Sequence, residues 1–146
     1  MKIVLIYVNN KNSVHDEAIN EYKKRLSRYA DFYEIRIEHS DIKTECENIE
    51  KKIETQDYVV LLDEAGSNMS SIDLAEFVDF RQNNSTKRLV FIIGGAYGAA
   101  PQIKERANYT LSLGKMVWPH ELARLMLIEQ IYRVYSILNN SPYHHK

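Results

Sequence analysis

Three short runs of the sequence are continuously apolar and rich in β-branched residues, and they constrain the fold more than any other feature. They span Ile3 to Val8, Tyr58 to Leu62 and Leu89 to Ile93. Short apolar runs without alternation are typical of strands buried on both faces, as in the parallel sheets of α/β proteins. Segments in which apolar residues recur at helical spacing separate these runs. The pattern therefore predicts an α/β fold with a mainly parallel sheet flanked by helices.

Periodicity together with start and stop signals predicts the other elements. Ser70, followed three residues later by Asp73, resembles a capping box, and Ser13 is a candidate helix N-cap. The expected strands are Ile3 to Val8, Phe32 to Ile37, Tyr58 to Leu62, Leu89 to Ile93 and Tyr109 to Leu113, and the expected helices are about Val14 to Tyr29, Asp41 to Glu54, Ser70 to Asn83, Ala100 to Ala107 and Pro119 to Leu138. The sequence has no linker or internal repeat, and 146 residues suit one core. We expect a single domain over residues 1–146.

The last expected helix is apolar around much of its circumference. A helix packed on a sheet buries one stripe, so a second apolar stripe indicates burial against another subunit. Polar residues interrupt it at Arg124, Glu129, Gln130 and Arg133. Arg124 and Glu129 are five residues apart and share no face, so an ion pair within the helix explains them poorly. A role at an interface or a site is a serious alternative to a surface role.

Charge is distributed unevenly, although the net charge is only −1. Residues 1–30 carry six basic and three acidic side chains, residues 31–80 four and fourteen, and residues 81–146 nine and three. The acidic middle is explained by solvated helix surfaces, whereas the basic ends either are solvated too or together form a nucleic-acid footprint. One cysteine, Cys46, fits a buried inert thiol. No apolar run is long enough to span a membrane and no metal-ligand spacing stands out, so we expect a cytoplasmic protein without a metal.

Two glycine-containing turns follow neighbouring apolar runs. Gly94 to Gly98 comes after the run that ends at Ile93, and Leu113 to Trp118 after the run that ends near Leu113. Each turn alone is explained by chain reversal, and Met116 and Trp118 fit an ordinary core. Taken together, the free backbone groups and the apolar side chains suit a flat heteroaromatic ring such as adenine. In parallel sheets, ligands bind beyond the carboxyl ends of the strands, which favours a binding site here.

These pieces, taken in order along the chain, resemble a known family. The matching pieces are Glu21-Tyr22 with Lys24-Arg25, Leu61-Leu62-Asp63 with Gly66, Ile93 to Gly98, Leu111 to His120 with its Met and Pro-His, and Arg124 to His144 with its Glu-Gln, Tyr-Arg and Pro-Tyr-His. The chain resembles the RlmH-type family of ribosomal RNA large-subunit methyltransferases, of the SPOUT superfamily. The resemblance covers essentially the whole chain.

This resemblance implies a fold, a methyl donor and partners. It implies a homodimer with a trefoil knot in the C-terminal half, S-adenosylmethionine as cofactor, and methylation at N3 of a pseudouridine in 23S rRNA of the assembled ribosome. The implied cofactor contacts are Leu62, Gly94, Leu113, Gly114, Lys115, Met116, Val117 and Trp118. Arg124, Tyr143 and His144 are implied at the target base, with His120 near the cofactor pocket. General rules of topology do not predict a knot.

The expected chemistry gives two of these residues separate roles. We expect Arg124 to stabilise the anion that forms on the base, and His144, or a water that it positions, to accept the imide proton. Two rival interpretations stay open. In the first, the chain is a non-catalytic ribosome-binding or RNA-binding protein. In the second, it is a SPOUT methyltransferase that acts on another RNA such as tRNA.

Overall fold

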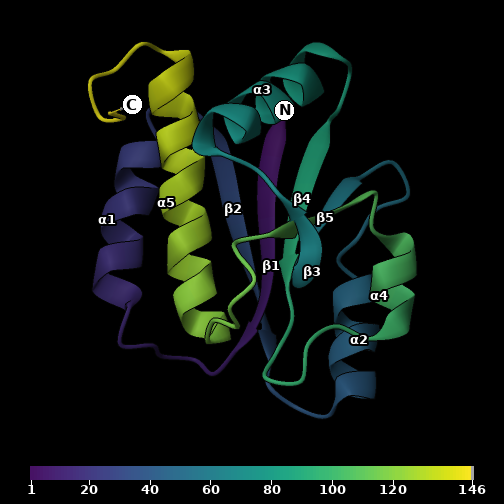
Figure 1. The fold of residues 1–146 in the computed structure, drawn as a ribbon. Helices are drawn as coiled ribbons and strands as arrows, with labels where there is room; N and C mark the ends of the chain where they lie inside the picture. The colour runs from purple at the N-terminus through teal and green to yellow at the C-terminus, as the bar shows by residue number, and fades with distance from the viewer. Residues whose placement is uncertain (146) are drawn as a thin grey trace.

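The computed structural model describes residues 1–145, which form one parallel sheet with helices on both faces (Figure 1). The strands are β1 (Lys2–Asn9), β2 (Asp31–Glu38), β3 (Tyr58–Asn68), β4 (Arg88–Ile93) and β5 (Tyr109–Ser112), and the helices are α1 (Asp16–Leu26), α2 (Ile42–Glu50), α3 (Ser71–Asn83), α4 (Pro101–Arg106) and α5 (His120–Leu138). The strand order is β2-β1-β4-β3-β5, and every pair is parallel. The predicted α/β class is confirmed.

Two apolar clusters, one on each face of the sheet, hold the layers together. Alternate residues of β1 point to opposite faces, as in any strand. Ile3 and Leu5 pack with buried residues of α1, α3 and α5, whereas Val4 and Ile6 pack with those of α2 and α4. Figure 1 shows the same arrangement, with α1 and α5 side by side and α2 beside α4 on the other face. The central strands are apolar throughout because both faces are covered.

Strand β3 is longer than predicted. The sequence predicts that it ends at Leu62, yet β3 continues to Asn68 and pairs with β5 a second time after a register shift between Leu62 and Ser67. Gly66 permits this second pairing. A Cβ atom there would lie 2.6 Å from the Thr110 carbonyl oxygen, so only glycine lets the two strands approach.

Helix ends differ from the prediction in α1 and α2. The α2 helix ends at Glu50 rather than near Glu54. The α1 helix runs from Asp16 to Leu26 rather than from about Val14 to Tyr29, and it begins without a side-chain cap. Ser13 instead accepts a hydrogen bond from the His15 N–H at 3.2 Å, so it shapes the turn before the helix. The predicted capping box at α3 is confirmed, since the Ser70 hydroxyl and the Asp73 carboxylate each accept from the other residue's N–H.

Candidate functional site

A cleft of about 830 Å³ opens at the carboxyl ends of β4 and β5, beside the middle of β3. Its walls are Leu62 to Ala65 of β3, the segments after β4 and β5, Lys104 of α4 and the start of α5. It is large enough for a nucleoside-sized ligand. The lining residues are Leu62 to Ala65, Ile93 to Ala99, Lys104, Leu113, Gly114, Met116 to His120 and Ala123. Every residue predicted to contact the cofactor lines this cleft except Lys115. His120 also lines it, as expected.

Glycine is required at the floor of the cleft. A Cβ atom at Gly94 would lie 2.8 Å from the backbone of Gly98, because the loop folds back on itself. The Gly98 N–H donates to the Gly95 carbonyl at 2.9 Å, and Gly98 has a φ of +81°. These constraints leave a tight turn in which the backbone of Gly94, Gly95 and Gly98 lines the cleft directly.

The second glycine turn is shaped by a buried serine. The Ser112 hydroxyl donates to the Gly114 carbonyl at 2.7 Å and accepts from the Gly114 N–H at 3.0 Å. Beyond this turn the apolar side chains of Met116, Val117 and Trp118 are exposed, by 73%, 78% and 39%. Adjacent exposed apolar side chains at the edge of a cleft mark a surface that a ligand or a partner covers.

Glu45 of α2 supports the glycine loop from behind. Its carboxylate is buried, accepts from the Ser40 N–H at 2.8 Å and lies 3.1 Å from the His39 ring. A Cβ atom at Gly95 would lie 2.8 Å from Glu45 Oε1 and 3.2 Å from Val8 Cγ1. The carboxylate therefore occupies the space behind Gly95 and fixes the loop against the sheet.

Gly95→Ala is expected to lower the free energy of unfolding by about 1–3 kcal/mol, because the added methyl overpacks this space. Thermal unfolding measures the loss. Adding Glu45→Ala removes the oxygen that the methyl meets, so the double variant should lose less than the sum of the two single variants. Strictly additive losses would mean that the carboxylate does not limit the space behind Gly95.

A second group of polar residues lies at the other end of α5. Asn140 adopts a left-handed φ of 55°, and the Ser141 N–H bonds back to Ser136, so the tail folds onto α5. Tyr143 then packs edge-on against Tyr132, with ring centroids 4.7 Å apart. The predicted catalytic residues Tyr143 and His144 are thus half-buried neighbours of α5 rather than frayed.

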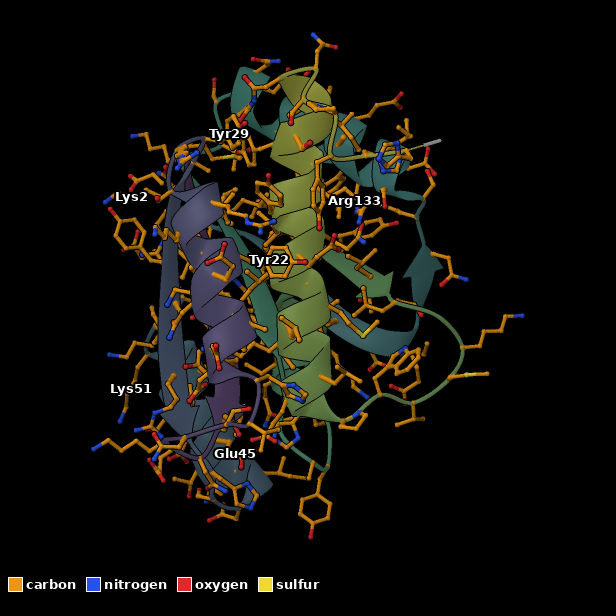
Figure 2. All side chains as sticks on the ribbon, turned by 90° about the vertical axis from the view of Figure 1, so that its left-hand side faces the viewer. Lys2, Tyr22, Tyr29, Glu45, Lys51 and Arg133 are labelled. Carbon is orange, nitrogen blue, oxygen red and sulfur yellow. The ribbon has the colours of Figure 1, made fainter. Side chains whose placement is uncertain are left out.

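Arg133 and Glu129 complete this group, which we call the tail cluster (Glu129, Arg133, Tyr143 and His144). Arg133 donates to the Glu129 carboxylate at 2.6 and 3.0 Å, and its Nη1 lies 3.1 Å from His144 Nδ1. The Tyr143 hydroxyl donates to the same carboxylate at 2.9 Å. Tyr22 points from α1 toward α5 and its hydroxyl lies 3.3 Å from that of Tyr143 (Figure 2).

The charges of the tail cluster change the acidity of its members. Burial, hydrogen bonds to Tyr22 and Glu129, and the Glu129 charge all raise the pKa of Tyr143. The hydroxyl therefore stays protonated at neutral pH and acts as a donor. The Glu129 carboxylate raises the pKa of Arg133, which keeps its charge.

Arg124 has a different environment from the tail cluster. Its guanidinium is buried and pairs with Glu34 of β2 through two hydrogen bonds of 2.6 and 2.9 Å. It also lies 3.5 Å from Asp16 and 4.0 Å from the centre of the Tyr7 ring. A role of Arg124 at the target base stays a prediction, and its contacts within one chain are those of a structural ion pair.

The sequence analysis left the role of Arg133 open between the surface, an interface and a site, although its pairing with Glu129 has a local signal. Glu129 and Arg133 are four residues apart, the spacing at which helical side chains pair, and Arg133 follows Tyr132 in the matched Tyr-Arg pair. Arg124 and Arg133 are nine residues apart, which is two and a half turns, so they face opposite sides of α5.

Comparison with known proteins identifies the class. Residues 1–144 match the family model described as "Predicted SPOUT methyltransferase". The chain belongs to the SPOUT methyltransferase family, and it is an enzyme of the methyltransferase class.

Several relatives are similar over their full length. Proteins named ribosomal RNA large subunit methyltransferase H from Parabacteroides distasonis and Christiangramia forsetii are 40% and 38% identical to it, each over 100% of both chains. One from Carboxydothermus hydrogenoformans is 37% identical over 99% of both. The resemblance inferred from the motifs is confirmed.

Two further findings concern residues 1–145. None of the helices they form is both long and apolar enough to cross a membrane. Among these residues no three His, Cys, Asp or Glu side chains are grouped so that they could hold a metal ion.

Proposed function

We propose that this chain transfers a methyl group from S-adenosylmethionine to N3 of a pseudouridine in 23S rRNA of the assembled ribosome, in the cytoplasm. The relatives' names support the ribosomal RNA substrate. The single observation that carries the cofactor is the cleft at the ends of β4 and β5 beside β3, with the glycine backbone and the exposed apolar side chains that line it. These features suit an adenosyl group, whose base stacks on apolar side chains while backbone groups bond its edge.

The cofactor supplies a methyl group on a positively charged sulfur, which is a good leaving group. The protein therefore needs no covalent intermediate, and positioning accounts for most of the rate. Met116 and Trp118 would hold the adenine, and the backbone of Gly94 and Leu113 would bond its polar edge. These residues fit the group by shape and polarity.

The target nitrogen becomes a good nucleophile once its imide proton leaves. In our proposal His144 accepts that proton, Arg133 stabilises the negative charge on the base, and the Tyr143 hydroxyl donates a hydrogen bond to the base. Exposed cations of α1 and of the turn after it, namely Lys24, Arg25 and Arg28, suit rRNA phosphates.

The separation of the cleft from the tail cluster supports a homodimer. Ala123 lines the cleft and Arg133 lies ten residues further along α5, which is about 15 Å along the helix axis. Transfer requires the donor and the base in contact, so one chain's cleft would work with the tail cluster of a second copy. A groove of about 590 Å³ lies beside α5, and its lining includes the apolar side chains of Leu74, Leu111, Leu125 and Met126. In our proposal the second copy binds in this groove. The trefoil knot stays a prediction.

Two measurements test the proposed function. Calorimetry with S-adenosylmethionine is expected to show one site per subunit, and Trp118→Ala should weaken binding about 10-fold because it removes apolar contact area. Mass spectrometry of rRNA from cells with and without the gene should show the loss of one methyl group on a pseudouridine of 23S rRNA. Absence of cofactor binding would favour a non-catalytic RNA-binding protein. If cells without the gene lack a methyl group in tRNA and not in 23S rRNA, the substrate is tRNA.

A further inference from the structure

Two opposite charges lie next to each other in the lining of the cleft. Asp63 follows Leu62 on β3, and its Oδ1 accepts from the Ala65 N–H at 3.0 Å, which fixes the carboxylate. Lys104 comes from α4, and its Nζ lies 3.9 Å from Asp63 Oδ2. Both side chains line the cleft and remain in contact with solvent, with 20% and 56% of their surface exposed.

This pair contributes little to the fold. An exposed lysine and carboxylate at such a distance stabilise a protein weakly, because water screens them and the lysine loses side-chain freedom. The pair is therefore easily separated by a ligand that offers each group a partner. A ligand carrying both a cationic and an anionic group exchanges one weak ion pair for two closer ones.

The rest of the lining narrows the choice of ligand groups. Within residues 1–145, Lys104 is the single lysine or arginine that lines the cleft. Apart from Asp63, Glu64 and His120, the other lining residues present apolar side chains, a tyrosine ring, a tryptophan ring or backbone. An anionic ligand group in this cleft therefore has Lys104 as its charged partner.

We propose that Asp63 and Lys104 bind the amino-acid end of the methyl donor. Lys104 donates to the α-carboxylate and Asp63 accepts from the α-ammonium, while the adenosyl end lies along Met116 and Trp118. This inference rests on the proposed function and assigns two side chains beyond the predicted cofactor contacts. The demethylated product keeps the same amino-acid end, so the pair holds donor and product alike.

The experiment compares two ligands that differ in this end. S-adenosylhomocysteine carries the amino-acid group, and methylthioadenosine lacks it. Calorimetry on the full chain with Lys104→Met is expected to show S-adenosylhomocysteine binding weakened about 10-fold and methylthioadenosine binding unchanged. Asp63→Asn should give the same selective loss. Lys87→Met is the matched control, because Lys87 is an exposed lysine just before β4, at the opposite end of the sheet from the cleft.

The outcomes separate this inference from the proposed function. If the wild-type chain binds neither ligand, the proposed function fails. If it binds both, but each variant weakens both ligands equally or neither, the assignment of Asp63 and Lys104 is overturned. A thermal midpoint within about 2 °C of wild type is expected for both variants, since the pair is exposed.

Discussion

His144→Ala and Arg133→Met are expected to lower the turnover number for methyl transfer by about 100-fold to 10,000-fold each, the range that one positioned acid–base group supplies. Donor binding should stay unchanged in both variants, because neither side chain lines the cleft. The physical reason is that Arg133 Nη1 lies 3.1 Å from His144 Nδ1, so a charge-stabilising group and a proton acceptor stand next to each other. Methyl incorporation into ribosomes under single-turnover conditions gives the rate, and calorimetry gives the donor affinity.

Tyr143→Phe separates the hydroxyl of the tail cluster from its ring. The phenylalanine keeps the edge-on packing against Tyr132 and loses the hydrogen bond to Glu129. Since the pKa of Tyr143 is raised by burial and by its hydrogen bonds, the hydroxyl is protonated throughout the neutral range. We expect a smaller loss of turnover, about 10-fold, without a change in the pH at which turnover is half-maximal.

Tyr135→Phe is the matched control for the tyrosine variant. Tyr135 is a buried tyrosine of α5 whose hydroxyl donates to the side chain of Gln82 on α3, away from the tail cluster. Loss of the Tyr135 hydroxyl should leave the turnover number unchanged. Near wild-type turnover of both His144→Ala and Arg133→Met would remove the tail cluster from the mechanism.

The order of elements was predictable because each depends on local sequence. The apolar runs of β1, β3 and β4 are buried on both faces, and the spacing of apolar residues in α5 is helical. The capping box at Ser70 was also a local signal and is confirmed. The position of the cleft followed from a general rule, since parallel strands carry their binding loops at their carboxyl ends.

The features that sequence reasoning missed depend on contacts between distant segments. The second pairing of β3 with β5 requires Thr110 to approach Gly66, and nothing near Gly66 in the sequence announces that partner. The tail returns to α5 because Asn140 reverses the chain, and the same motif of two asparagines also fits an ordinary frayed end. Secondary-structure propensity does not predict the second β3–β5 pairing or the return of the tail, because packing between distant segments determines both.

The two arginines of α5 show the same limit within one helix. The resemblance placed Arg124, and not Arg133, at the target base. In the fold the two side chains have different partners: Arg124 faces β2 and pairs with Glu34, whereas Arg133 faces the returning tail and lies beside His144. Helical spacing shows that the two face apart, but only the fold shows which side carries His144.

Arg124→Met is expected to lower the free energy of unfolding by about 3–5 kcal/mol, the cost of leaving a buried charge without its partner. Glu34 is buried, with 6% of its side chain exposed, and would keep only Lys23 at 2.8 Å. For a domain of this size the loss corresponds to a thermal midpoint about 10 °C lower. Arg25→Met is the control, because Arg25 forms an exposed pair with Glu21 and its loss should leave the midpoint unchanged.

A double variant and the pH dependence identify the ion pair as the cause. Burial opposes ionisation of Glu34, but the hydrogen bonds from Arg124 and Lys23 outweigh it and lower the pKa of that carboxyl. A lowered pKa in the folded state means that the pair stabilises the fold above the unfolded pKa, about 4.3, and that this contribution is lost as the pH falls through the folded value. The midpoints of wild type and Arg124→Met should therefore converge in acid. Arg124→Met with Glu34→Leu should recover much of the loss at neutral pH, since both charges of the buried pair are then removed together. If Arg124→Met instead unfolds at the wild-type temperature, binds the donor and fails to transfer the methyl group, Arg124 acts on the target base as the sequence predicted.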